Sequence, residues 1–246
     1  MKKSLYILLF IIGTSVQTFA QEKVLSPAIN TANKKFIKSE TSLMNWFMLQ
    51  DTLKIPIGSV QTQIQKRKEQ LYIITTVNMK QMSAPWVDTT IVGMKDFKPM
   101  YHSSYNQQRD MVLKFEEKVT GYYLDKQTAS KTAIFEVANK PFFDSNFYPQ
   151  LIRWLPLKNG YANTISIFDY NPKGKTGLLI ATIKNTEGIT MSFNGKKEQV
   201  WKVTVTDDLS NNTAITTYYL DKLTRQLLKQ EIDFGGRKML MELVEY

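Results

Sequence analysis

The scarcity of catalytic residue types limits the chemistry that this chain can perform. His102 is the only histidine, and the chain has no cysteine, so metal sites built from several histidine or cysteine ligands are excluded. No Gly-x-Ser-x-Gly motif presents a serine nucleophile to a histidine base. The sequence therefore predicts no catalytic residue, no metal and no other cofactor, and we expect His102 at the surface or in a loop.

Residues 169–180 resemble two kinds of ligand-binding loop without completing either. Gly174-Lys175-Thr176 matches the end of a phosphate-binding loop, but Asp169 stands where that loop needs its first glycine. As a calcium loop, the segment would have Lys173 at a ligand position and Ile180 in place of the closing glutamate. We therefore expect a turn between two strands here.

Carboxylate pairs could support glycoside hydrolysis, which needs two carboxyl groups about 5–9.5 Å apart. Glu116-Glu117 and Asp207-Asp208 are each adjacent in the chain, so on strands their side chains point to opposite faces. A hydrolase acting on envelope polysaccharide or peptidoglycan is an alternative function. It would require carboxylates from different strands to converge in an open cleft.

One aromatic segment has the features of a helix. Residues 144–155 could be capped by Asp144 or Ser145, and Pro156 would end the helix. Apolar residues then recur at helical spacing on one face. Most aromatic side chains are expected in the core, but a concave apolar pocket beneath this helix would suit an acyl chain or stacking on sugars. The candidate ligand-binding residues are Phe143, Phe147, Leu151 and Trp154.

Most of the remaining chain is typical of β-strands. Short runs rich in β-branched and aromatic residues are separated by turn sequences such as Asn194-Gly195 and Gly235-Gly236. No helices alternate with these runs, as a parallel sheet would require. The predicted fold is mainly β: an antiparallel meander forming a curved sheet or half-barrel in two similar halves, with one central helix.

An internal repeat supports the two halves. The heptad YYLDKQT at 122–128 recurs as YYLDKLT at 218–224, and in both copies the aspartate is expected to open a turn by accepting backbone hydrogen bonds. The copies reflect either a duplicated unit or a common hairpin turn that arose twice. The expected organisation is an extended arm over 21–41 and a single β-rich domain over 42–246, whose halves, 42–140 and 157–246, are joined by helix 144–155.

The first twenty residues are typical of a bacterial secretory signal peptide. Lys2 and Lys3 precede an apolar run over residues 5–12, and a small-x-small sequence indicates cleavage between Ala20 and Gln21. No later segment approaches the roughly 18 apolar residues of a membrane helix. We expect an exported protein, periplasmic or associated with the outer membrane, without a lipid anchor because no cysteine can carry one.

The formal net charge is +10, and most of the basic residues are lysines scattered in short clusters. Arginine forks, which bind phosphate in a bidentate manner, are few. Together with export, this makes a nucleic acid partner unexpected. The charge indicates a solvated surface or attraction to anionic lipid or polysaccharide.

The second half of the chain carries a family resemblance. Leu155-Pro156-Leu157 ends the expected helix, Trp201-Lys202-Val203 forms the centre of a strand, and a Leu-Asp-x-x-Thr hairpin begins at Leu220. With residues 53–58 as a first strand ending in glycine, these features resemble the exported bacterial domain-of-unknown-function family 3108 over residues 40–242.

That resemblance implies a mostly antiparallel β fold in the periplasm or at the outer membrane and brings no catalytic residues. Residues 81–108 have no counterpart in the family pattern and look like an insertion. The expected sheet and helix are also similar in outline to periplasmic lipoprotein carriers.

These observations favour a non-enzymatic role at the cell envelope. We expect the protein to bind an apolar or lipid-like ligand in the concavity, with helix 144–155 as its cover, or to act as an envelope-assembly partner. Two alternatives remain: the hydrolase described above, and a purely structural partner of another envelope protein. A glycan is the other ligand class that the aromatic residues would suit.

Overall fold

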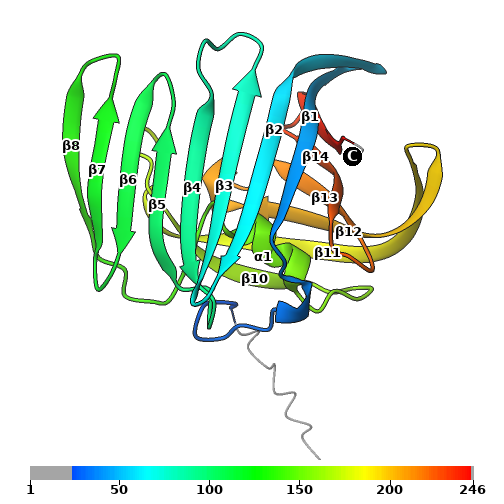
Figure 1. Cartoon of the computed structure of the whole chain (residues 1–246), viewed down its shortest axis with the longest axis horizontal. Coiled ribbons are helices and arrows are strands. Elements are labelled where there is room, and N and C mark those ends of the chain that lie inside the picture. The colour runs from blue at the N-terminus through cyan, green and yellow to red at the C-terminus, as the bar shows by residue number, and fades with distance from the viewer. Residues whose placement is uncertain (1–23, 245–246) are drawn as a thin grey trace, which may run out of the picture.

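The structure, a computed structural model, describes residues 24–244, which form one curved, open sheet of 15 strands (Figure 1). Every strand pairing is antiparallel except that of β9 with β10. The predicted fold class, mainly β with a curved antiparallel sheet and one helix, is confirmed. The expected signal peptide over 1–20 and its cleavage site at Ala20 and Gln21 lie outside the described residues.

The strands follow one another with a single α-helix between β9 and β10 in the described part of the chain. Their bounds are β1 (Glu40–Gln50), β2 (Leu53–Arg67), β3 (Gln70–Met79), β4 (Trp86–Gly93), β5 (Pro99–Tyr105), β6 (Arg109–Phe115), β7 (Val119–Asp125), β8 (Ser130–Glu136), β9 (Phe143–Asp144), α1 (Tyr148–Trp154), β10 (Asn163–Asp169), β11 (Gly177–Phe193), β12 (Lys196–Asp207), β13 (Ile215–Asp221), β14 (Leu227–Asp233) and β15 (Lys238–Leu243), with 3₁₀ helices η1 (Lys34–Phe36) and η2 (Asp208–Ser210).

Two meanders meet at the centre of the sheet. The chain runs from β1 to the edge strand β8, crosses through β9 and α1, and returns from β10 to β15. β15 then pairs with β1, so that Met44 lies opposite Leu243. The first and last strands therefore join the two meanders, and β8 and β9 are the free edges.

The repeated heptads form matching turns. Asp125 and Asp221 each accept the backbone N–H groups of the residues two and three positions further on, at 2.6–3.3 Å. The next residue, Ala129 or Arg225, has a positive φ of 54° or 65°. The aspartate-initiated turns expected at both copies are confirmed.

The curved sheet folds over on itself around two hydrophobic clusters. The larger cluster surrounds α1, which lies inside the curve of the sheet (Figure 1). The smaller cluster packs strands β6–β8 against β10 and β11, through side chains such as Met111, Tyr123 and Phe168. This cluster fills the middle of the gap between the two flanks of the sheet, and cavities lie towards either end of β6.

The helix is shorter than the sequence predicts. α1 covers Tyr148–Trp154, inside the expected range 144–155. The chain before it pairs with β10 as β9, and the Asp144 carboxylate accepts the N–H of Asn146 at 2.7 Å, which forms a turn instead of a helical start. The cap position is Phe147, which makes no side-chain capping bond, so the expected acidic or hydroxyl cap is wrong.

The N-terminal arm packs below α1 (Figure 1). Leu25 forms a parallel bridge with Ile165 of β10, and the N–H of Asn33 donates to the carbonyl of Trp154 at 2.7 Å. No helix among residues 24–244 has the length and apolar character needed to cross a membrane.

Candidate ligand-binding site

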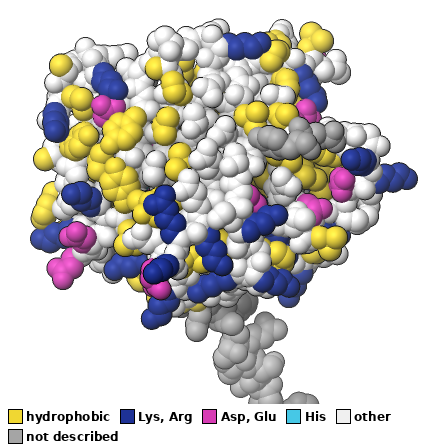
Figure 2. Space-filling view, in the orientation of Figure 1, with side chains coloured by type: hydrophobic (Ala, Val, Ile, Leu, Met, Phe, Trp, Pro, Cys, Tyr) yellow, Lys and Arg dark blue, Asp and Glu magenta, His cyan; other side chains and the backbone are white. Residues whose placement is uncertain are grey.

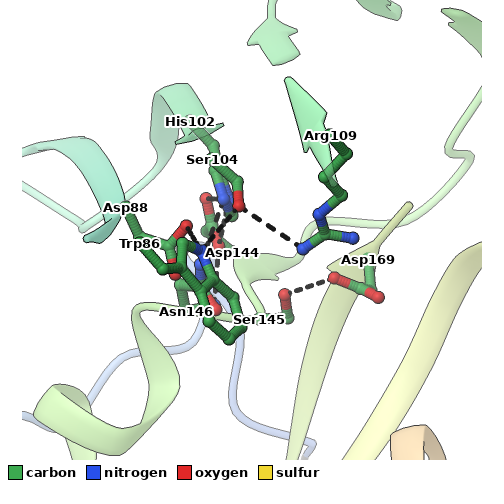
Figure 3. Close-up of polar contacts among 9 residues, drawn as sticks. All are labelled: Trp86, Asp88, His102, Ser104, Arg109, Asp144, Ser145, Asn146 and Asp169. Atoms are coloured by element: carbon green, nitrogen blue, oxygen red, sulfur yellow. Dashed lines mark hydrogen bonds and ion pairs between the residues drawn. The ribbon is translucent and has the colours of Figure 1, made fainter. Parts of the chain in front are cut away.

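Three neighbouring strands direct polar side chains to one end of the gap between the flanks. Alternate residues of a strand share a face, so Trp86 and Asp88 of β4 lie on one face, as do His102 and Ser104 of β5. Asp88 is opposite Ser104 in the strand pairing, and Arg109 begins β6. Figure 3 shows that these side chains face residues from β9, the following turn and β10, namely Asp144, Ser145, Asn146 and Asp169.

His102 is held at both ring nitrogens. Its Nδ1 lies 2.9 and 3.2 Å from the two carboxylate oxygens of Asp144, and its Nε2 lies 3.0 Å from the side-chain nitrogen of Asn146. In the neutral imidazole, Nδ1 carries the proton and donates to Asp144, while Nε2 accepts from Asn146. His102 is 2% exposed and Asp144 is 0% exposed. The expected surface or loop position of His102 is therefore wrong, because the histidine sits on β5 with a buried carboxylate as its partner.

The charge state of His102 follows from two opposing effects. Burial disfavours the imidazolium, but the Asp144 carboxylate outweighs burial, so the pKa of His102 is raised above its ordinary value of 6.5. A raised pKa means that the folded protein binds this proton more tightly than the unfolded chain does.

Trp86 is anchored by its indole nitrogen. The N–H donates to Asp88 Oδ1 at 2.8 Å and to Ser104 Oγ at 2.9 Å. Arg109 Nη2 contacts the same hydroxyl at 3.4 Å, and its guanidinium lies 5.8 Å from the Trp86 ring centroid. Among the described residues, the buried Nε of Arg109 has no hydrogen-bond partner.

Two more carboxyl groups near this site have raised pKa values. Burial raises the pKa of Asp88, although hydrogen bonds from Ser104 and Trp86 oppose the shift. Burial also raises the pKa of Asp169, which accepts a 2.7 Å hydrogen bond from the Ser145 hydroxyl. The site thus combines one buried acid, Asp144, and two half-buried acids, Asp88 and Asp169, with one arginine and one histidine.

Three adjoining cavities make up a groove at this end of β6, here called the Trp86 groove. The central cavity has a volume of about 250 Å³, and its wall includes Trp86, His102, Arg109 and Asp169. A second cavity of about 380 Å³ shares Trp86 and Arg109 with it. A third, of about 200 Å³, lies over α1 on the concave side and shares Asn146 with the central cavity.

The acidic residues of the site are distributed among different cavities. Asp169 lines the central cavity, Asp88 lines the third, and Asp144 is engaged by His102. The acceptor nitrogen of His102 faces the Asn146 amide rather than a hydroxyl. Within residues 24–244, no cluster of three or more histidine, cysteine or acidic side chains could hold a metal ion.

The four residues predicted to contact an apolar ligand lie in the main core. Phe143, Phe147 and Leu151 are 0% exposed and Trp154 is 1% exposed. Phe147 and Trp154 pack against the Phe97 ring, with centroids 5.3 and 5.9 Å away. The side of α1 that faces the third cavity carries Pro149, Gln150 and Arg153 instead. Contact between the four residues and a ligand stays a prediction.

The sequence carries a pattern that indicates the Trp86 groove, namely polar residues at every second position of two strands. A search for clustered aromatic residues does not find this pattern. Trp86, Asp88 and Thr90 alternate along β4, and His102 and Ser104 alternate along β5. Polar residues at period two on strands whose same-face positions are buried indicate a polar interior site. From the sequence, Asp169 is considered only as part of an incomplete phosphate-binding or calcium loop.

The family model described as "Protein of unknown function (DUF3108)" matches residues 42–242 of the chain. No curated protein matches the chain. The matched range includes every strand from β2 to β14 and all residues of the Trp86 groove named above.

Proposed function

Because the chain belongs to the DUF3108 family, whose function is unknown, we propose a function from the Trp86 groove: non-enzymatic binding of a glycan at the cell envelope. The observation that carries the proposal is the anchored Trp86, which lines two adjoining cavities whose other lining residues are mostly polar. An aromatic ring beside hydrogen-bonding side chains suits a sugar, which has an apolar ring face and hydroxyls at its edge.

The residues beyond Trp86 extend this surface. The second cavity is lined by the Tyr123 ring and by Asn106, Gln108 and Gln127, and Asn171 is common to the two cavities. Side-chain amides both donate and accept hydrogen bonds, as sugar hydroxyls do. Two adjoining cavities of about 250 and 380 Å³ offer room for more than one sugar unit. The ligand is therefore proposed to be an oligosaccharide segment.

Binding is favoured over hydrolysis by the placement of the acids. A glycosidase needs two carboxyl groups on either side of one bond, but Asp169 and Asp88 line different cavities. Asn146 occupies the histidine nitrogen that would act as a base. Export, expected from the leader over residues 1–20, would bring the protein to the glycans of the envelope.

Replacing Trp86 tests the proposal. We expect Trp86→Ala to weaken binding of chitotetraose or tetragalacturonate at least tenfold, about 1.4 kcal/mol, because the stacking surface is lost. Trp86→Phe should retain more affinity, since it keeps a ring while losing the indole N–H. Isothermal titration calorimetry gives the affinities, and urea unfolding checks that each variant is folded.

Phe135→Ala serves as the matched control, because Phe135 is an aromatic residue of β8 that is 63% exposed and lines none of the three cavities of the groove. Its affinity should equal that of the original protein. Failure of both oligosaccharides to bind the folded protein would contradict the proposal. Release of shorter sugars, detected by chromatography, would instead favour the hydrolase.

A further inference from the structure

A separate cavity lies towards the other end of β6, where Phe115 ends the strand. Its volume is about 460 Å³, and we call it the Phe142 cavity. The turn between β6 and β7, the segment after β8 and the N-terminal arm at Pro27 and Ala28 surround it. None of its lining residues is shared with the Trp86 groove.

The inner wall of the Phe142 cavity is apolar. Phe115 is 6% exposed and Val119 is 2% exposed, and both belong to the smaller hydrophobic cluster. The half-buried Phe142 ring packs on this cluster, with its centroid 5.9 Å from that of Phe115 and 5.1 Å from that of Phe168. An apolar chain entering the cavity would therefore continue an existing core contact.

The rim of the cavity is charged and balanced. It carries three basic and three acidic side chains, which are Lys98, Lys118, Lys140, Asp96, Glu116 and Glu117. Among residues 24–244, none of the six takes part in an ion pair. Figure 2 shows basic and acidic side chains intermingled along the lower left of the molecule, the side on which Figure 1 places the turn between β6 and β7.

We propose that the Phe142 cavity binds a single-chain zwitterionic phospholipid. The acyl chain would lie on Phe115, Val119 and Phe142, the phosphate would be bound by the lysines, and the ammonium by the glutamates. A fatty acid would leave the two glutamates without a cationic partner, and a neutral glyceride would also leave the lysines without an anionic one. The volume suits a drug-sized ligand and therefore one acyl chain.

Binding of lyso-phosphatidylethanolamine with a 14-carbon chain tests the proposal. The protein is purified after export without detergent, and the lipid is titrated below its micelle concentration by calorimetry and native mass spectrometry. We expect one bound lipid, with at least tenfold weaker binding of myristate and of monomyristoylglycerol. Equal binding of the three probes, or none of lyso-phosphatidylethanolamine, would overturn the proposal.

Variants of the lining residues test whether the lipid binds in the Phe142 cavity. Phe142→Asp should weaken the binding of lyso-phosphatidylethanolamine at least tenfold by charging the apolar wall, whereas Phe234→Asp, at an exposed aromatic residue after β14 that lines none of the four cavities described above, should not. If Phe142→Asp does not fold, a double variant at two exposed lysines, Lys118→Glu with Lys140→Glu, takes its place. It should weaken the binding of lyso-phosphatidylethanolamine tenfold without changing the affinity for monomyristoylglycerol. Unchanged affinity in the folded variants would refute the site. Trp86→Ala should bind the lipid normally, so this test is independent of the glycan proposal.

Discussion

Single buried residues decide the chemistry of the Trp86 groove, and His102 is the strongest case. A polar group that loses water needs a partner for each donor and acceptor, and Asp144 and Asn146 satisfy both ring nitrogens. The imidazole is therefore held in a fixed position, and neither ring nitrogen is free to act as a base toward a ligand. His102 therefore contributes to the shape and charge of the groove wall by holding Asp144 and Asn146 in place.

The stability of the protein should fall as the pH rises from 6 to 8.5. The folded-state pKa of His102 is raised above the ordinary value of 6.5, so its stabilising contribution is fully present below about pH 6.5 and is lost as the pH rises through the folded pKa. His102 is the only histidine, so no other side chain ordinarily titrates in this range. The urea unfolding midpoint, measured across this range, should decrease.

Asp144→Asn is the informative variant for this pH dependence. The asparagine keeps the shape of the side chain but removes the carboxylate that raises the pKa of His102. The fall in stability between pH 6 and 8.5 should therefore become smaller. Burial raises the pKa values of Asp88 and Asp169, which also makes stability fall with rising pH. The Asp144 charge adds to the rise at Asp169, so the variant should reduce that contribution as well. A pH profile identical to that of the original protein would show that the pair does not control it.

At the scale of elements, β7 depends on a glycine for its approach to β6. Gly121 has a φ of 151°, and a Cβ built on it would lie 1.8 Å from the carbonyl oxygen of Val112. Alanine would therefore both strain the backbone and collide with the neighbouring strand. We expect Gly121→Ala to lower the free energy of unfolding by more than about 1 kcal/mol, measured by urea denaturation.

Gly195→Ala separates these two effects. Gly195 has a positive φ of 78°, but a Cβ there meets nothing within 4 Å. This variant carries backbone strain without a collision, so its loss of stability should be smaller than that of Gly121→Ala. Equal losses would mean that strain alone explains the effect and that β6 can move away.

Sequence patterns predicted most elements because their inward faces are apolar. The turns at Asp125 and Asp221 and most strands follow directly from period-two alternation and turn residues. β4 and β5 were missed, since residues 81–108 looked like an insertion. Their inward positions carry Trp86, Asp88, His102 and Ser104, and this polar site removes the apolar alternation that identifies a strand.

At the scale of the whole molecule, the features that the sequence could not predict depend on contacts between residues far apart in the chain. β1 and β15 pair although about 200 residues separate Met44 from Leu243, and no local pattern specifies that partner. The folding of β6–β8 onto β10 and β11 likewise decides which polar residues meet. The aromatic segment and the burial of most aromatic side chains were therefore predicted, while the positions of both cavities were not predictable.

We expect the small cluster between the flanks to couple the two proposed sites. Phe168 is 2% exposed; it lies opposite Asp144 in the pairing of β10 with β9 and packs on Phe142. Phe168→Ala should lower the free energy of unfolding by about 3–5 kcal/mol. The folded variant should bind both the oligosaccharide and lyso-phosphatidylethanolamine more weakly. The two flanks of the sheet form the walls of both sites, and the substitution removes the contact that holds the flanks together.

Phe168→Leu provides the comparison, since it keeps most of the apolar volume and should affect both ligands less. Calorimetry at a temperature where each variant is folded measures the two affinities side by side. Trp86→Ala and Phe142→Asp should each impair one ligand, whereas Phe168→Ala should impair two. If only one affinity falls in Phe168→Ala, the two ends of the gap are held by separate contacts, and the cluster stabilises the fold without linking its sites.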